Sequence, residues 1–352
     1  MKKIISLIIL AIFIVGCGNT EVDDNDILVI NTDSSSYDHV VPYENSYNRF
    51  FHSSKDYKEI GQGLVEISKD YFPTDEYDLK EGIVIRNYND DYHPLVKLRE
   101  STNNPYGLNP EGSLKLKVNE TTEVSGPFLV SDIYEIDFVA KEEKNELAGV
   151  SLALVLNKTI FDENGSPILV DDKVLYSFGT EVAGPKLESY LRKKPELANI
   201  PIVITIFVSD VGNQSVPGNF IAEAQYQNRQ GQFKAISHKW AIFPTPSGRL
   251  IDGYVDEQIS KLKRSVNEIL AEDIGIVAYG EFKDNQLVRL NIDVSVQTKT
   301  YTEILALTNY IAQAIKNMEM TASIRVEMSS MSDTLAVIVK GLNSTSIEII
   351  MM

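Results

Sequence analysis

Cysteine is nearly absent from this sequence: of its 352 residues, only Cys17 is a cysteine. A lone cysteine excludes an intrachain disulfide, so the fold does not depend on one. Histidine is scarce as well, and no two histidines form an HExxH motif or another i, i+4 pair of zinc ligands. The four histidines are His39, His52, His93 and His238. No G-x-S-x-G nucleophile elbow is present. The sequence therefore predicts no catalytic residue, no metal site and no cofactor.

Positive charge is also in short supply. The 33 Lys and Arg residues stand against 50 Asp and Glu residues, which gives a net charge of -17. Such a surface repels nucleic acid and anionic lipid headgroups, so we expect no nucleic-acid partner. Beyond residue 16, no hydrophobic stretch approaches the roughly 20 apolar residues that a membrane-spanning helix needs.

The N-terminus is the hydrophobic exception. Lys2 and Lys3 give it a positive start, the run from Ile4 to Val15 is almost wholly apolar, and polar sequence resumes at Gly18. This is the three-part layout of a secretory signal, and the run is too short to span a bilayer comfortably. We therefore expect residues 1–16 to be a signal peptide.

The single cysteine ends this run in the lipobox order Ile14, Val15, Gly16, Cys17. A thiolate is the nucleophile that lipid transfer requires, and Gly16 leaves room for a peptidase at the bond before Cys17. The alternative is that Cys17 is an ordinary small apolar residue of a signal or anchor. Stable anchoring takes two or more acyl chains, so we expect a diacylated Cys17. The expected partners are the lipid bilayer and the lipoprotein-processing enzymes, and the expected location is the outer face of the cytoplasmic membrane.

The next segment, residues 17–46, is acidic and rich in serine. It contains Glu21–Asp26 with one valine among acidic and amide residues, and then Ser34–Ser36. Such a composition buries too little apolar surface to fold. We expect a flexible tether here.

The rest of the chain predicts an α+β fold built from two related repeats. Each repeat has the order helix-strand-strand-helix-strand-strand, which is typical of antiparallel sheets with one face covered by helices. The first repeat is expected over 47–247 and the second over 248–352. In the first, the helices are expected near 60–72 and 175–191, and the strands at 133–139, 150–156, 201–208 and 220–226. In the second, the helices are expected at 255–269 and 304–315, and the strands at 276–282, 288–296, 322–328 and 335–339.

Two features interrupt the first repeat. Residues 75–128 give weak, mixed signals rich in Asn, Gly and Pro, and are interpreted as an insertion. Gly184-Pro185 falls inside an expected helix, where proline costs about 3 kcal/mol. The helix is therefore expected to kink there, or else to restart with Pro185 at its first position.

A candidate binding surface lies in the insertion. Tyr88, Tyr92 and Tyr106 stand among prolines, and tyrosines are common at recognition surfaces. The alternative is an irregular loop that packs its own aromatics. Acidic pairs such as Asp90-Asp91 are interpreted as solvated faces, although a glycosidase-like carboxylate pair stays open because its members need only be close in space.

Several local motifs, in order, resemble the CamS (YerH) family of firmicute lipoproteins, which are sex pheromone precursors. They are Tyr71–Asp75, Gly107–Pro110, Gly149-Val150, Leu197–Val208 and Pro217–Ile221. The resemblance covers nearly the whole chain after the signal peptide, including the two repeats. It implies no catalytic residues, because the family has none assigned.

The resemblance also implies a second product of the gene. The family's pheromone is a heptapeptide within the signal peptide that begins Ala-Ile-Phe-Ile. Here Ala11–Ile14 match, but only Val15 and Gly16 follow before Cys17, one residue short of seven. The expected peptide comprises Leu10, Ala11, Ile12, Phe13, Ile14, Val15 and Gly16, or starts at Ala11. Phe13 would be its anchor in a receptor pocket.

Three functions are therefore to be weighed. The first is a membrane-anchored lipoprotein whose mature part is a non-enzymatic binding or envelope module, for a peptide, glycan or wall fragment. The second is a cell-surface hydrolase. The third is a solute-binding lipoprotein, for which parallel βαβ lobes would be expected in place of the hairpins seen here.

Overall fold

The computed structural model describes residues 27–28, 36–41, 54–85, 87–142, 146–162, 164–210, 215–228, 230–270, 274–297, 299–331 and 333–352. The predicted signal peptide, the lipobox with Cys17 and the pheromone-like segment from Leu10 to Gly16 lie outside these residues.

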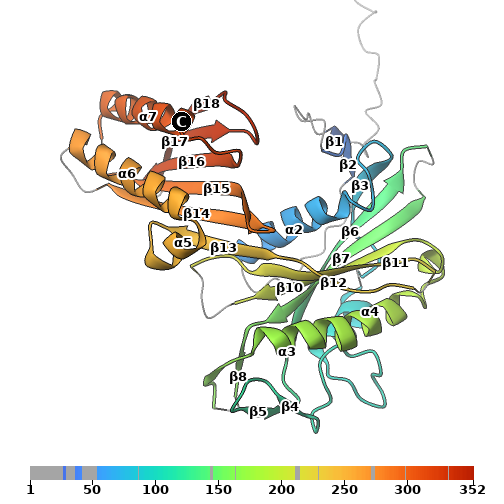
Figure 1. Cartoon of the computed structure of the whole chain (residues 1–352). Coiled ribbons are helices and arrows are strands. Elements are labelled where there is room, and N and C mark those ends of the chain that lie inside the picture. Colours follow the sequence, from blue (N-terminus) through green and yellow to red (C-terminus); the bar gives the residue numbers. More distant parts are fainter. Residues whose placement is uncertain are drawn as a thin grey trace, which may run out of the picture.

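Two sheets dominate the structure (Figure 1). The first is eight-stranded, in the order β1-β2-β3-β6-β7-β10-β11-β12. Its strands are Ile27–Leu28 (β1), His39–Val41 (β2), Tyr77–Glu81 (β3), Val130–Ala140 (β6), Leu147–Asn157 (β7), Ile202–Ser209 (β10), Asn219–Tyr226 (β11) and Lys234–Ala235 (β12). The second is six-stranded and runs from β13 to β18 in sequence order. Its strands are His238–Phe243 (β13), Gly275–Lys283 (β14), Gln286–Ser295 (β15), Ser323–Ser330 (β16), Asp333–Lys340 (β17) and Glu348–Met351 (β18).

Both sheets are mixed, so the prediction of antiparallel sheets is wrong. β6–β7 and β10–β11 pair antiparallel, but β7 and β10 pair parallel. The second sheet repeats this pattern, with β15 and β16 parallel between two antiparallel pairs. In each case a helix lies between the two parallel strands in the chain. A helical crossover returns the chain to the end of the sheet from which it started, so the next strand runs parallel.

The helices cover the two sheets differently. In the first sheet, α2 (Ser54–Ser68) packs on one face through Ile60 and Leu64, together with Val203 and Phe207 of β10. The opposite face is covered by α3 (Asp172–Ser177), the π-helical η2 (Phe178–Ala183) and α4 (Gly184–Leu191). The prediction of one covered face is therefore wrong here. β10 is buried along its whole length, which explains its unbroken apolar sequence.

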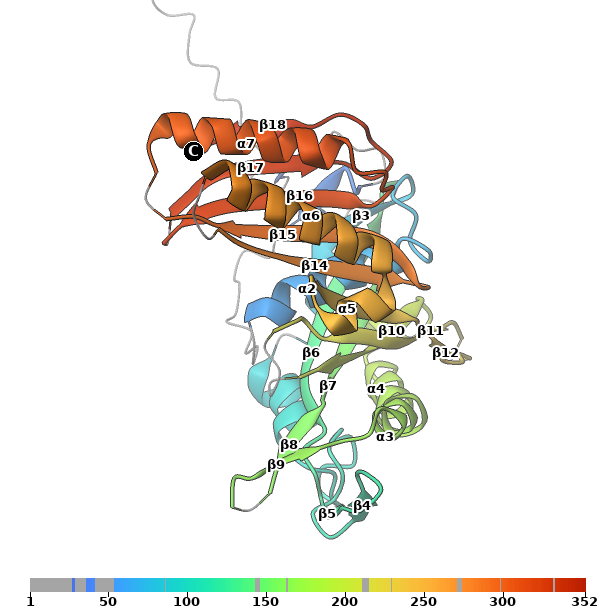
Figure 2. The same ribbon diagram turned by 60° about the vertical axis from the view of Figure 1, so that its left-hand side comes forward.

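In the second sheet, the two helices of the same repeat lie on one face. α6 (Gly253–Leu270) and α7 (Tyr301–Lys316) contact each other and share one core with β14–β17 (Figure 2). α7 begins with a capping box between Thr300 and Glu303. A short α5 (Pro246–Ile251) precedes α6. The face of this sheet opposite to α6 and α7 turns toward α2 (Figure 1), so α2 lies between the two sheets.

The helix expected over 175–191 is present and is not interrupted at Pro185. The π-helical segment Phe178–Ala183 leads directly into α4, where Pro185 occupies one of the first helical positions. A proline there gives up no hydrogen bond that the new helix needs. The wider π-helical turn of η2, just before Pro185, is found where a kink was expected.

Part of the predicted tether is folded. β1 and β2 pair antiparallel, and β2 pairs parallel with β3 at the edge of the first sheet. Tyr37 is buried, and its hydroxyl donates a 2.7 Å hydrogen bond to the carbonyl oxygen of Phe72. The prediction of a flexible segment over 17–46 is therefore wrong for residues 27–28 and 36–41. Tyr37 supplies apolar burial that the acidic composition lacks.

Two predicted boundaries also shift. β3 belongs to the first sheet although it lies within the predicted insertion 75–128. The rest of that range includes the π-helical η1 (Tyr88–Lys97) and the hairpin of β4 (Lys115–Lys117) and β5 (Glu123–Ser125). A second small hairpin pairs β8 (Thr159–Phe161) with β9 (Pro167–Leu169). The second sheet begins with β13 at His238, before the predicted repeat boundary at 248.

Candidate binding site

A pocket of about 420 Å³ opens beside η1 and the end of α4; we call it the Asp91 pocket. Its volume lies within the usual range for small-molecule sites, about 300–1,000 Å³. It is lined by Ile83, Val84, Asn87, Asp90, Asp91, Leu147, Lys194 and Glu196. The lining therefore combines an apolar wall with carboxylates, one amide and one ammonium group.

Two buried carboxylates behind the apolar wall fix its backbone. The N–H of Ile83 donates to Asp137 at 3.0 Å, and the N–H groups of Val84 and Ile85 donate to the two oxygens of Glu135 at 2.6 and 2.7 Å. Glu135 and Asp137 are two residues apart on β6, so both side chains project from the same face of the strand. This wall is thus built before any ligand arrives.

The pKa of one of the two carboxylates is strongly shifted. Complete burial raises the pKa of Asp137 well above its usual range, and the neighbouring Glu135 carboxylate raises it further. Burial therefore favours the neutral form of Asp137. Glu135 accepts the two shortest N–H hydrogen bonds of the wall.

The floor of the pocket is the carboxylate of Asp91, which is buried. It accepts a 2.6 Å hydrogen bond from the Tyr190 hydroxyl and forms a 2.8 Å ion pair with Lys194. Burial raises the pKa of Tyr190, and the hydrogen bond to Asp91 raises it further, so Tyr190 stays a donor. The side chain of Asn87 caps η1 by accepting the N–H groups of Asn89 and Asp90.

The three predicted tyrosines do not form one surface. Tyr92 is buried and donates from its hydroxyl to Asp132 at 2.7 Å, so it is a core residue. Tyr88 is exposed and stacks on Tyr92 with ring centroids 5.8 Å apart. Tyr106 packs on Tyr190 at 5.7 Å. None of the three tyrosines lines the Asp91 pocket, although Asn87, the residue before Tyr88, does.

The sequence interpretation missed Asp91. It treated Asp90-Asp91 as a solvated pair, and that description fits Asp90 alone, because Asp91 is buried. Its partners Tyr190 and Lys194 lie 99 and 103 residues further along the chain. No local pattern carries that information.

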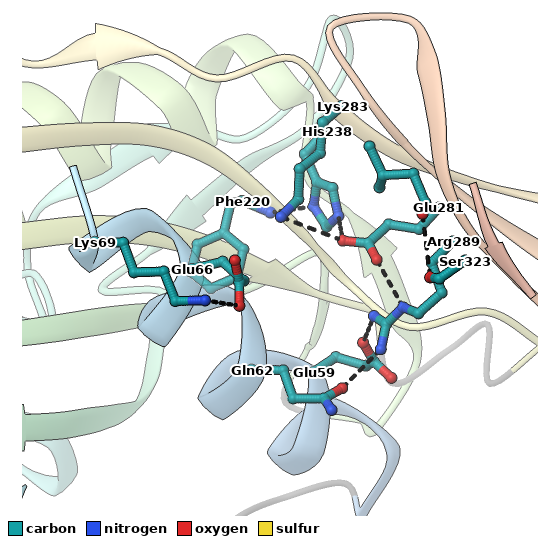
Figure 3. A network of polar contacts seen from close by, with 11 residues as sticks. Glu59, Gln62, Glu66, Lys69, Phe220, His238, Glu281, Lys283, Arg289 and Ser323 are labelled. Carbon is teal, nitrogen blue, oxygen red and sulfur yellow. Dashed lines mark hydrogen bonds and ion pairs between the residues drawn. The ribbon is translucent and has the colours of Figure 1, made fainter. Parts of the chain in front are cut away.

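A second polar cluster joins α2 to the two sheets (Figure 3). Arg289 of β15 donates to Glu281 of β14 at 2.8 Å, to Gln62 of α2 at 2.7 Å, and also to Glu59 of α2. His238 lies 3.0 Å from Glu281 through Nε2, while its Nδ1 accepts the N–H of Phe220. Because Nδ1 accepts, Nε2 carries the proton and donates to Glu281.

This junction cluster keeps Glu281 ionised. Burial acts to raise the pKa of Glu281, but the hydrogen bond from His238 and the charges of Arg289 and Lys283 outweigh it and lower the pKa to about 2. The ring of Trp240 lies beneath the Arg289 guanidinium, 5.2 Å from its centre. The cluster therefore joins α2 and the two sheets through its own side chains.

Other site types are not found in the part of the chain that the structure describes. No group of three or more His, Cys, Asp or Glu side chains among those residues is placed to hold a metal ion. Within the same residues, no helix is long and apolar enough to cross a membrane.

Together these features define a two-sheet α+β protein with a preformed polar pocket. Residues 45–346 match the family model described as CamS sex pheromone cAM373 precursor. The chain belongs to the CamS family, and the predicted resemblance is confirmed.

Two solved structures have this fold. The sex pheromone precursor from Lactobacillus salivarius subsp. salivarius UCC118 aligns with a TM-score of 0.77 at 21% identity, covering 93% of this chain and 98% of that one. The C-terminal domain of the sex pheromone staph-cAM373 precursor from Staphylococcus aureus aligns with a TM-score of 0.70 at 20% identity, covering 85% and 97%. A comparison with curated proteins finds no match.

Proposed function

We propose that this protein is a lipoprotein anchored through Cys17 at the outer face of the cytoplasmic membrane, and that its folded part binds a small ligand in the Asp91 pocket without enzymatic chemistry. The observation that carries the binding role is the pocket itself. Its wall is held by Glu135 and Asp137, and its floor by Tyr190 and Lys194, so the site needs little ordering when a ligand enters.

Blocking the pocket tests the binding role. Leu147 lines it, and tryptophan in its place would fill much of the space. We expect Leu147→Trp to abolish a hit from a thermal-shift screen of wall fragments, glycans and peptides. The matched control is Leu250→Trp on α5, where the side chain is 90% exposed. A hit that survives Leu147→Trp, or no hit at all, counts against this role.

Anchoring rests on the lipobox ending at Cys17. Lipid transfer needs the thiolate, so Cys17→Ala should leave a precursor that takes up no radioactive palmitate and keeps residues 1–16. Equal labelling of the Cys17→Ala protein would contradict anchoring at this residue.

We also propose that the discarded signal peptide is the source of a pheromone-like peptide. Cleavage before Cys17 leaves an apolar segment that ends Ala11–Gly16, with Phe13 as its largest contact surface. Synthetic LAIFIVG and AIFIVG should induce a response in pheromone-responsive recipient cells. Silence at micromolar peptide, beside an active family peptide, would remove this part of the proposal.

The two sheets are further proposed to derive from one duplicated unit. In support, α2-β6-β7-α4-β10-β11 and α6-β14-β15-α7-β16-β17 follow the chain in the same order with the same pattern of strand pairing. The main divergence is in the first helix: α2 and α4 lie on opposite faces of the first sheet, whereas α6 and α7 lie on the same face of the second. Superposing 133–226 on 274–339 should align four strands and the second helix in order; a match in another order would contradict the duplication.

A further inference from the structure

The lining of the Asp91 pocket is unequally charged. Three of its side chains are carboxylates, Asp90, Asp91 and Glu196, and one is an ammonium, Lys194. The ion pair of 2.8 Å between Lys194 and Asp91 makes the floor neutral. Asp90 and Glu196 remain exposed, and neither forms an ion pair with another described residue. The pocket therefore presents two uncompensated negative charges at its rim.

Both rim carboxylates stand on ordered backbone. The amide of Asn87 donates to the Asp90 carboxylate, and Asn87 is itself the cap of η1. Glu196 lies in the single turn η3 (Pro195–Leu197), which is closed by a 3.0 Å hydrogen bond from Leu197 to the carbonyl of Lys194. Charges on fixed backbone lose little freedom when they pair with a ligand.

The apolar wall limits the kind of ligand that can bind beside the two rim carboxylates. Val84 is buried, and Ile83 and Leu147 are partly exposed at the pocket. An aliphatic chain on this wall would lose contact with water and gain packing. An anionic head would be repelled by the two rim carboxylates. A neutral donor would form hydrogen bonds to them, and a cationic N–H donor would add the attraction between opposite charges to the same hydrogen bonds.

We propose that the Asp91 pocket takes a ligand that carries a primary ammonium group on a short aliphatic chain, with the ammonium between Asp90 and Glu196 and the chain on Ile83, Val84 and Leu147. This inference rests on the proposed binding function and names its ligand class. The ammonium belongs to a free aliphatic amine or to an amine of a peptide, and the two sources are separated below.

The experiment compares three probes of equal chain length: pentylamine, pentanol and pentanoate. The mature chain from residue 17 carries Cys17→Ser to omit the lipid, and binding is followed by the NMR shifts of the backbone amides of Val84 and Asn87. Pentylamine should bind most tightly and pentanoate most weakly. Nα-acetyl-lysine amide and a lysine-free peptide with a free amino terminus then show whether a side-chain or a terminal amine is preferred.

A double variant that replaces both rim carboxylates by amides supplies the decisive comparison. Asp90→Asn with Glu196→Gln should weaken pentylamine by at least roughly fivefold, the value of one modest ion pair, and leave pentanol unchanged. Both positions are exposed, so the fold is retained. The matched control is Glu257→Gln, an exposed carboxylate on α6 of the second sheet, which should bind all probes like the parent.

The outcomes separate this inference from the proposed function. Pentylamine that binds no better than pentanol, or that binds the double variant as well as the control, overturns the ammonium proposal. If pentanol or a glycan still shifts Val84 and Asn87, and Leu147→Trp abolishes that shift, the pocket remains a binding site. If no probe shifts these amides, both the inference and the binding role fail.

Discussion

The hydroxyl of Tyr190 donates a 2.6 Å hydrogen bond to Asp91, although 99 residues separate them in the chain. Tyr190 comes from α4, which covers the first sheet, and Asp91 comes from η1, which lies in the irregular region after β3. The contact thus fixes an irregular segment to a regular one. It holds Asp91, which lines the pocket, in place.

Removing that hydroxyl should weaken the pocket. Tyr190→Phe leaves Asp91 with Lys194 as its remaining side-chain partner, and a lost hydrogen bond to a charged group costs about 1.5–3 kcal/mol. We expect this loss in the free energy of unfolding from urea titration. Tyr106→Phe is the control, because its ring packs on Tyr190 but its hydroxyl forms no hydrogen bond with another residue that the structure describes. Equal stabilities of the two variants would contradict the role given to this contact.

The junction between the sheets should depend on Arg289. Arg289→Met leaves Glu281 buried with His238 and the more distant Lys283, and removes both links to α2. Hydrogen bonds to charged groups contribute about 1.5–3 kcal/mol each, and solvent weakens those of the partly exposed Arg289. We therefore expect Arg289→Met to lower the free energy of unfolding by about 2 kcal/mol in total.

The matched control for this change is Arg325→Met on β16. Its partner Glu327 is partly exposed, as is Arg325 itself. Exposed pairs contribute about 1 kcal/mol or less, so this variant should lose little. The fluorescence of Trp240, the single tryptophan, reports the junction directly because its ring lies under Arg289. Unchanged fluorescence and stability in Arg289→Met would show that the cluster does not hold the sheets together.

Acid should weaken the junction in a defined range of pH. The folded pKa of Glu281 is about 2, below its ordinary value of 4.5. A depressed carboxyl pKa stabilises the fold fully above the unfolded value, and this stabilisation is lost as pH falls from about 4.5 toward about 2. Glu281→Gln should therefore show a flatter dependence of unfolding free energy on pH in that range. Glu257→Gln should follow the parent, and a parent-like slope in Glu281→Gln would exclude Glu281 as the responsible group.

Much of the fold could be predicted because its elements are long and periodic. The apolar residues of α6 and α7 recur at helical spacing, and the strands from β14 to β17 lie within a few residues of the expected ranges. The covered second face of the first sheet also had a signal, since the unbroken apolar run of β10 indicates burial on both sides. The expectation of an antiparallel sheet with helices on one face overlooked this signal.

Other features had no local signal. The strands β1 and β2 are two and three residues long, too short to show a period. The parallel pairing of β7 with β10 depends on where the intervening helix packs. The pocket depends on contacts such as Lys194 with Asp91 that bring together distant parts of the chain. These features depend on tertiary packing, which cannot be predicted from local patterns in a single sequence.

Two of the motifs that suggested the family meet in the core of the first sheet, and this contact predicts a strict requirement for glycine. A Cβ on Gly149 would lie 2.0 Å from the ring of Phe72, which is fully buried and stacks on Phe138 at 4.1 Å. Phe72 cannot move away without disturbing that stack, and overpacking of this kind costs about 1–3 kcal/mol. Gly149→Ala should therefore lose about that much stability in urea titration, with an unchanged denaturant slope. Gly275→Ala on β14 is the control, because its nearest neighbour would lie at an ordinary 3.4 Å, and its change should stay within about 0.5 kcal/mol. A Gly149→Ala protein as stable as the Gly275→Ala protein would mean that the Phe72 stack is not rigid, and that these motifs are not linked by packing.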